Sequence, residues 1–96
     1  MRLTELQKSI IIEAVKSTDP DAQLWLFGSR TDDSKKGGDI DIAVLSEKIN
    51  RDSMLVIQVQ RYICDGIGEQ KIDIVTSSEG KEAFFRLAVE EGIKLL

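Results

Sequence analysis

The chain has 96 residues, of which 42% are hydrophobic and 31% are charged, and these values predict one domain spanning residues 1–96. Its formal net charge of -4 argues against bulk nucleic-acid binding, which needs clustered lysine and arginine. Because the sequence has no histidine and one cysteine, it excludes histidine-based nucleophile systems, the usual catalytic zinc sites and an intrachain disulfide.

The chain begins with the pattern of a helix followed by a strand. Thr4 and Gln7 form a capping-box pattern ahead of apolar residues at helical spacing, which predicts a helix ending near Ser17. Residues 19–21 include a proline and predict a turn. The short apolar run QLWLF, residues 23–27, then predicts the first strand.

The middle of the chain predicts a loop, a second strand and a second helix. Residues 29–38 are polar, with the pattern of one helical turn at their start. Alternation in DIDIAVL, residues 39–45, predicts the second strand. Residues 51–64 carry an apolar helical face, and Gly66 follows as a stop, which predicts a helix. The β-branched residues within 56–59 also fit a strand.

A third strand and a last helix complete the pattern. KIDIVT, residues 71–76, predicts the strand, and the helix after it has Ser77 or Ser78 as its cap and Gly92 as its stop. The order of elements predicts an α/β or α+β fold with helices covering one face of a small sheet. Aromatic residues at strand or helix spacing are expected in the core, namely Trp25, Tyr62, Phe84 and Phe85.

Aspartates inside the predicted strands are the most informative feature of the sequence. Asp39, Asp41 and Asp73 alternate with isoleucines, although aspartate is depleted from strands. Residues i and i+2 of a strand point to the same face about 6.5 to 7 Å apart, so Asp39 and Asp41 project together. If the third strand lies beside the second, Asp73 completes a cluster of three carboxylates.

Three clustered carboxylates repel one another unless a cation neutralises them. Carboxylates without histidine or cysteine select hard ions such as Mg²⁺ or Mn²⁺. Two such ions about 3.5 to 4 Å apart are a common device for in-line phosphoryl transfer. The alternative interpretation is an exposed sheet face on which the acidic residues are simply solvated.

A glycine-serine turn provides a second feature of the same kind. Gly28 and Ser29 directly follow the first predicted strand, where glycine allows a phosphate to approach and backbone N–H groups can donate to it. Taken alone, this dipeptide is more simply explained by an ordinary tight turn or helix cap. Combined with the three aspartates, the turn predicts a triphosphate cradle beside an acidic metal site.

Three segments together carry a resemblance to a known family: LFGSR at residues 26–30, GDIDI at 38–42 and KIDIV at 71–75. Their order and spacing resemble the minimal nucleotidyltransferases of the DNA polymerase beta superfamily. The resemblance implies a polymerase-beta-like fold with a small mixed sheet. It also implies transfer of a nucleoside monophosphate from a nucleoside triphosphate, most often ATP, with release of pyrophosphate.

The resemblance also implies roles for individual residues. The catalytic and metal-binding set, which would hold two Mg²⁺ ions, consists of Asp39, Asp41 and Asp73. Asp73 would also help to remove the acceptor proton. The nucleotide-binding set consists of Gly28, Ser29 and Arg30. A surface salt bridge from Arg30 to Asp32 or Asp33 is an alternative for that side chain, and Lys35 and Lys36 are expected to be solvated.

Partners and location follow from the resemblance and from the length of the chain. Small members of this superfamily are frequently antitoxins of HEPN/MNT toxin-antitoxin pairs, and some attach AMP to a tyrosine of the HEPN toxin. The alternative is a catalytically weak antitoxin that binds its toxin stoichiometrically. A small-molecule nucleotidyltransferase would need an added acceptor domain. With no signal-peptide pattern and no apolar stretch of about 18 residues, we expect a cytoplasmic protein without membrane association.

Overall fold

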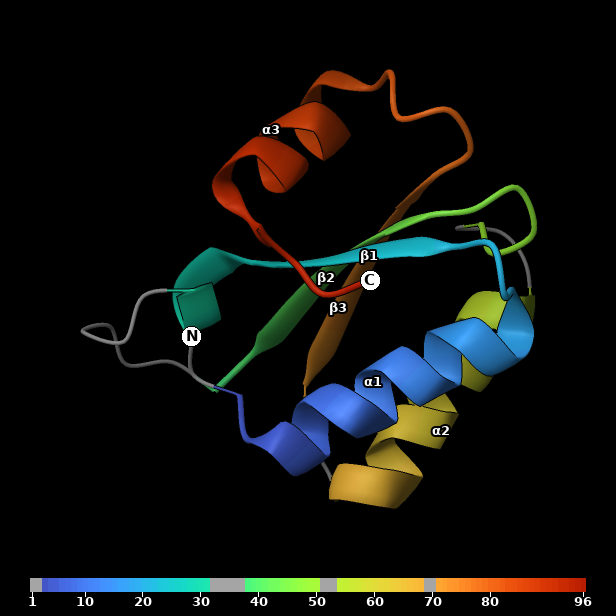
Figure 1. Ribbon diagram of the computed structural model, residues 1–96, viewed down its shortest axis with the longest axis vertical. Helices are drawn as coiled ribbons and strands as arrows, with labels where there is room; N and C mark the ends of the chain where they lie inside the picture. Colours follow the sequence, from blue (N-terminus) through green and yellow to red (C-terminus); the bar gives the residue numbers. More distant parts are fainter. Residues whose placement is uncertain (1–2, 32–37, 51–53, 69–70) are drawn as a thin grey trace.

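The structure is a computed structural model that describes residues 3–31, 38–50, 54–68 and 71–96. Within these ranges a four-stranded mixed sheet is combined with three α-helices, which confirms the predicted α+β class (Figure 1). The elements in chain order are α1 (Glu5–Thr18), β1 (Gln23–Phe27), the 3-10 helix η1 (Gly28–Thr31), β2 (Ile40–Leu45), α2 (Met54–Ile67), β3 (Ile72–Ser77), α3 (Ala83–Glu91) and β4 (Ile93–Lys94).

The sheet has the strand order β3-β2-β1-β4. β1 runs antiparallel to both of its neighbours, β2 and β4, whereas β2 and β3 run parallel. A parallel pair needs a crossover connection, and α2 supplies it. The two strands that carry the aspartate motifs therefore lie side by side and point in the same direction.

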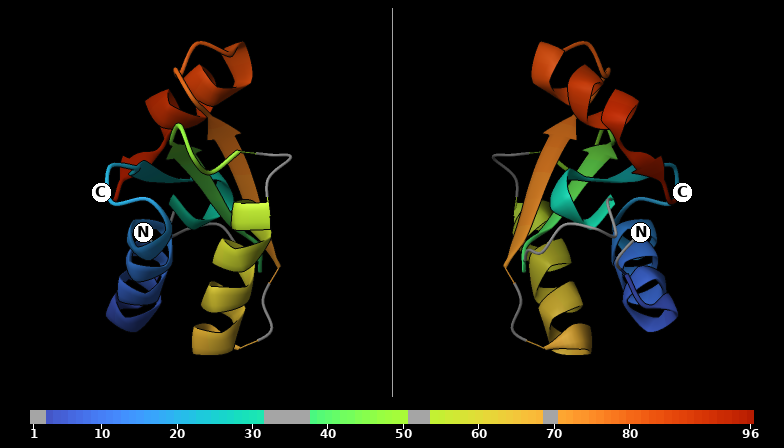
Figure 2. Two further views of the ribbon diagram at one scale, coloured as in Figure 1. Left: turned by 90° about the vertical axis from the view of Figure 1, so that its right-hand side faces the viewer. Right: turned by 90° about the vertical axis from the view of Figure 1, so that its left-hand side faces the viewer.

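Helices α1 and α2 cover one face of the sheet, side by side in both views of Figure 2. The capping box of α1 is formed as predicted, with Thr4 Oγ1 accepting from the Gln7 N–H at 3.0 Å. Gly66 lies inside α2, where an added Cβ would come within 2.8 Å of Ile10 Cγ2, so glycine allows the two helices to approach closely. The core under them comprises apolar residues of both helices and the sheet, including Ile11, Val15, Leu24, Leu26, Ile42, Val44, Val59 and Ile63.

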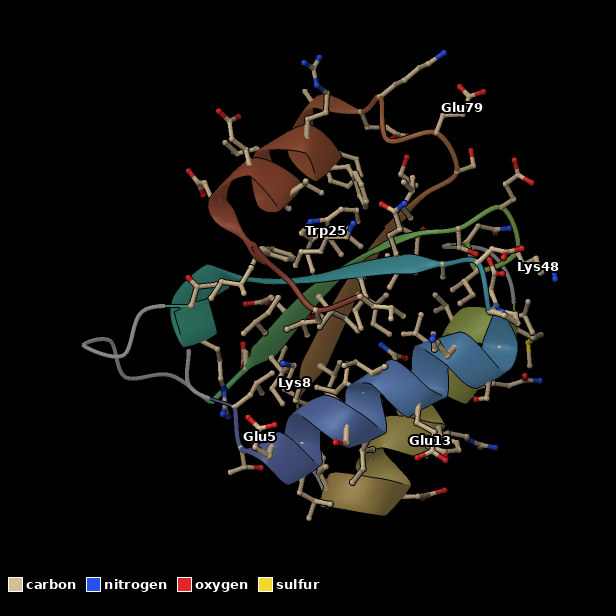
Figure 3. The ribbon with its side chains drawn as sticks, in the orientation of Figure 1. Glu5, Lys8, Glu13, Trp25, Lys48 and Glu79 are labelled. Atoms are coloured by element: carbon tan, nitrogen blue, oxygen red, sulfur yellow. The ribbon has the colours of Figure 1, made fainter. Side chains whose placement is uncertain are left out.

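Helix α3 packs on the opposite face, which corrects the expectation that the helices cover a single face (Figure 2). Trp25 points toward α3 in Figure 3 and meets Phe85 edge-to-face, with ring centroids 6.0 Å apart. Ala43 and Ala88 join this second core. Because Trp25 and Ala43 alternate with the residues of the first core, the central strands are apolar on both faces.

The second helix was only partly predicted by the sequence. Residues 56–59 are helical in α2, so the strand alternative is wrong. The predicted stop at Gly66 is also wrong, since α2 continues to Ile67 and the chain leaves it at Gly68, whose φ is +90°. The predicted start at residue 51 lies outside the described residues.

The connection between β3 and α3 also differs from the prediction. Ser77 is the buried last residue of β3 rather than a helix cap, and its hydroxyl accepts from the Gly80 N–H and donates to Glu82. Ser78 does not cap the helix either, because α3 begins after Glu82. The predicted stop at Gly92 is confirmed, and it is followed by the short strand β4, which the sequence did not predict.

Two aromatic residues expected in the core are exposed instead. Phe84 keeps 56% of its surface accessible and Tyr62 keeps 41%, whereas Phe85 and Trp25 are buried as predicted. Tyr62 projects from α2 and hydrogen-bonds to Glu13 of α1, and this bond is the main cause of its raised pKa. Neither side chain is required to fill the space between helix and sheet.

Among the helices in the described ranges, none combines the length and the apolar character needed to cross a membrane.

Candidate active site

Asp41 and Asp73 are brought together by the pairing of β2 with β3. The parallel register places them directly opposite each other, on the same face of the sheet as Ala43 and Val75. Asp41 is half-buried and Asp73 is exposed. Burial raises the pKa of Asp41, and the charge of Asp73 and a side-chain hydrogen bond with it raise the pKa further. The structure therefore contains a close pair of carboxyl groups.

Asp39 lies just before β2 and is less closely associated with this pair. Its charge adds to the raised pKa of Asp41, but its own Oδ2 lies 3.5 Å from Lys71 Nζ. In the part of the chain that the structure describes, no three acidic residues converge as a ready-made metal site. Asp41 and Asp73 thus form a pair, whereas Asp39 lies beside them in an ion pair with Lys71.

Gly28 places backbone directly against the carboxylate of Asp41. It follows β1, has a φ of +77°, and begins η1. A Cβ at this position would overlap Asp41 Oδ2, so any side chain here would have to displace that carboxylate. Thr31 Oγ1 donates to Gly28 O at 2.7 Å and closes the turn. The backbone of Ser29 belongs to η1, while its side chain lies outside what the structure describes.

Arg30 connects η1 to the segment that enters β2. Its Nη2 donates to the backbone oxygen of Gly38 at 3.1 Å. This contact holds the guanidinium at the same end of the sheet as Gly28 and Asp41. Residues 32–37, which include the predicted salt-bridge partners of Arg30 and the two loop lysines, lie outside the described residues.

The Gly28 turn and the carboxylate pair therefore lie at the same end of the sheet, where β1 ends and β2 and β3 begin. This end combines a glycine turn, an arginine and a carboxylate pair, which are the groups that phosphate and a hard cation require. A family model described as polymerase beta, nucleotidyltransferase, matches residues 9–96. The chain belongs to this family. No curated protein matches the sequence.

The polymerase beta nucleotidyltransferase match covers all four strands of the sheet and every residue named above in the candidate site. The general activity of such a domain is nucleotidyl transfer. Sequence reasoning did not single out Lys71, although it is the first residue of the KIDIV segment. Its position immediately before a strand that carries an aspartate was the available signal, because Asp39 stands immediately before the neighbouring parallel strand, beside Lys71.

Proposed function

We propose that this polymerase beta nucleotidyltransferase transfers AMP from ATP to a hydroxyl acceptor, a tyrosine of a partner HEPN-type toxin, and thereby acts as an antitoxin. The observation that carries the proposal is the pairing of Asp41 with Asp73 beside the Gly28 turn. Two adjacent carboxyl groups with backbone at contact distance form a site for a polyphosphate and its counter-ion.

The carboxyl groups fit a hard divalent cation. The pKa of Asp41 is raised by burial and by its neighbour Asp73, and the charge of Lys71 only partly opposes this, so a bound cation would favour the ionised carboxyl of Asp41. Asp39, Asp41 and Asp73 would hold two Mg²⁺ ions, with Lys71 released from Asp39. When bound, Mg²⁺ neutralises phosphate charge and makes an acceptor hydroxyl more acidic.

The chain itself supplies orientation and a proton acceptor. Backbone N–H groups of Gly28 and Ser29 would bind the triphosphate, and Arg30 would add a charge-assisted contact. Asp73 would accept the proton of the attacking hydroxyl. The acceptor oxygen forms a bond to the α-phosphorus as the bond to the bridging oxygen breaks, and pyrophosphate leaves with that electron pair.

Intact mass spectrometry tests the proposal directly. The purified chain is incubated with ATP, Mg²⁺ and the protein encoded next to it, and we expect a mass increase of one or more AMP groups on that protein. Asp41→Asn should abolish the increase, whereas Asp21→Asn, an exposed aspartate at the other end of β1, should preserve it. An unmodified partner in the presence of the native chain would contradict AMP transfer.

A second function, stoichiometric binding of the toxin without catalysis, is favoured by the ion pair between Asp39 and Lys71. That contact occupies a carboxylate which the catalytic proposal requires. The two functions differ in their need for ATP. Inhibition that requires ATP and persists after the antitoxin is removed supports catalysis, whereas inhibition that is independent of ATP and lost on removal supports binding alone.

A further inference from the structure

Two facing pairs of charged side chains lie where β2 and β3 begin. The parallel register sets Asp41 opposite Asp73. Two residues earlier along each segment, Asp39 and Lys71 form the next facing pair, with Lys71 Nζ 3.5 Å from Asp39 Oδ2. Because side chains at i and i+2 of an extended chain point to the same face, both pairs belong to one face of the sheet. One pair is acidic on both sides, and the other combines an acid with a base.

The backbone of Lys71 is held in place, whereas its ammonium group is accessible to solvent. Lys71 O accepts from the Ile40 N–H at 3.0 Å, which ties this residue to the start of β2. The side chain of Lys71 is 68% exposed and that of Asp39 is 48% exposed. Ion pairs with this exposure are weak, because water competes for both charges. The ammonium group can therefore leave Asp39 without uncovering a buried apolar surface.

The charge of Lys71 acts on more than one carboxyl group. It opposes the rise in the pKa of Asp41, whereas the charges of Asp73 and Asp39 both add to that rise. Within this group of four residues, one ammonium group faces three carboxyl groups. Lys71 is therefore the counter-ion that the polypeptide itself supplies to the candidate site.

A divalent cation and the ammonium group compete for the same carboxylate. Mg²⁺ ligated by a carboxylate lies about 2.0 to 2.1 Å from the oxygen, and the Lys71 ammonium already lies 3.5 Å from Asp39 Oδ2. Two positive centres this close would repel each other, and the doubly charged ion at the shorter distance has the stronger attraction for the carboxylate. Binding of the cation at Asp39 therefore requires the lysine to move away.

We infer that Lys71 is a positioning residue that competes with the divalent cation for Asp39 and thereby sets the cation concentration at which the site is loaded. The inference rests on the proposed function, because it takes Asp39 to be a cation ligand. The ion pair stabilises the cation-free protein. By linkage, it weakens cation binding by the same factor.

Calorimetric titration of the full chain with Mg²⁺ at constant ionic strength tests this competition. We expect Lys71→Met, which keeps an unbranched side chain and removes its charge, to bind Mg²⁺ about 2- to 5-fold more tightly, as the loss of an exposed ion pair implies. Lys71→Arg keeps the charge and should retain the native affinity. A lysine with only a structural role would give no gain in Mg²⁺ affinity on substitution.

The melting temperature of the Mg²⁺-free protein provides a second readout. We expect Lys71→Met to lower it, because three carboxyl groups lose their counter-ion. In an Asp39→Asn background the same substitution should lower it less, since the ion pair is already absent. An equal loss in both backgrounds would show that Lys71 does not act through Asp39 and would overturn the inference.

Lys81→Met is the matched control. Lys81 also forms an exposed ion pair, with Glu79 at 3.2 Å, but it follows the opposite end of β3, so its substitution should leave the Mg²⁺ affinity unchanged. An equal gain in affinity for Lys81→Met and Lys71→Met would overturn the inference, because it would reflect net charge alone.

The outcomes for Mg²⁺ binding separate the inference from the proposed function. Native or weaker affinity of Lys71→Met would overturn the role of Lys71 and leave the proposed function intact. Binding by Lys71→Met but not by the native chain would support the competition. If neither protein binds Mg²⁺, the proposed function fails, and the role of Lys71 fails with it.

Discussion

At the scale of single residues, the negative charge of Asp41 destabilises the fold. Its folded-state pKa lies above the ordinary value of 3.8, so ionisation destabilises the fold as the pH rises through that raised pKa. We expect Asp41→Asn to raise the melting temperature of the metal-free protein at pH 7, and the difference to shrink as the pH falls toward 4. Thermal denaturation followed by circular dichroism measures both, and a lower melting temperature for the variant at pH 7 would contradict this account.

Asp19 shows the opposite behaviour, since its charge stabilises the fold. It is 3% exposed, its Oδ2 accepts from Ser46 Oγ at 2.5 Å and its Oδ1 accepts from the Asp21 N–H at 3.0 Å. The hydrogen bond from Ser46 is the main cause of its lowered pKa. The stabilisation is therefore complete above the ordinary value of 3.8 and is lost as the pH falls through the lowered pKa.

We expect Asp19→Asn to lower the free energy of unfolding at pH 7 by about 1–3 kcal/mol, because it removes a charged hydrogen-bond acceptor from a buried position. The loss should decrease as the pH falls below 3.8 toward the lowered pKa, because the native carboxyl then becomes protonated, whereas asparagine is neutral throughout. Urea denaturation at several pH values provides the measurement. Asp21→Asn is the control, since Asp21 donates to Asp19 through its backbone N–H, which the substitution leaves in place; an equal loss in both variants would refute a specific role for the buried charge.

At the scale of elements, the turn from β1 into η1 depends on glycine for two separate reasons. Gly28 has a positive φ, and its missing side chain leaves room for Asp41. Gly68 has a φ of +90° but nothing within 4 Å of an added Cβ. Alanine at Gly68 therefore introduces only the backbone strain, of order 1–2 kcal/mol, whereas alanine at Gly28 adds the displacement of a carboxylate.

We expect Gly28→Ala to lose AMP transfer and to be less stable than Gly68→Ala, which should keep its activity. Urea denaturation and the mass-spectrometric assay give the two values. The comparison isolates the contact between Gly28 and Asp41, because both substitutions introduce the same side chain at a positive φ. Equal stability and equal activity of the two variants would show that this contact has no role.

The elements also show where sequence patterns are sufficient and where they are not. α1, β1 and the Gly92 stop follow from local signals, namely a capping box, a short apolar run and a helix-breaking residue. The exposure of Phe84 does not, because α3 has nine residues and only one side of it reaches the sheet. β4 has two residues and forms only because β1 offers an open edge, so no local pattern announces it.

At the scale of the whole molecule, the candidate site is a product of strand order. Alternation predicted that Asp39 and Asp41 share a face, and the adjacency of β2 and β3 brings Asp73 to Asp41. The ion pair between Asp39 and Lys71 was beyond local reasoning, since it depends on where two parallel strands begin. The strand positions of Asp41 and Asp73 therefore followed from the sequence, whereas Asp39 lies just before β2 and its ion-pair partner is set by the sheet.

Mg²⁺ should stabilise the whole fold by relieving the repulsion within the carboxylate pair. We expect the melting temperature to rise with added Mg²⁺, by about 4–8 °C for each kcal/mol of linked binding energy. Asp41→Asn should respond much less, whereas Asp21→Asn should respond like the native chain. A titration with Mg²⁺ followed by differential scanning calorimetry measures this shift, and no response of the native chain would contradict a cation site at these residues.

The pairing of β4 with β1 has a consequence for how the domain folds. Leu24 exchanges backbone hydrogen bonds with Leu95 and Leu96, so the first strand along the chain meets residues that follow the last strand. Contacts between residues so far apart in sequence carry a large loop-closure entropy and slow the folding rate. Because α3 lies between β3 and β4 along the chain, we expect α3 to become ordered after α1 and α2 have packed on the other face.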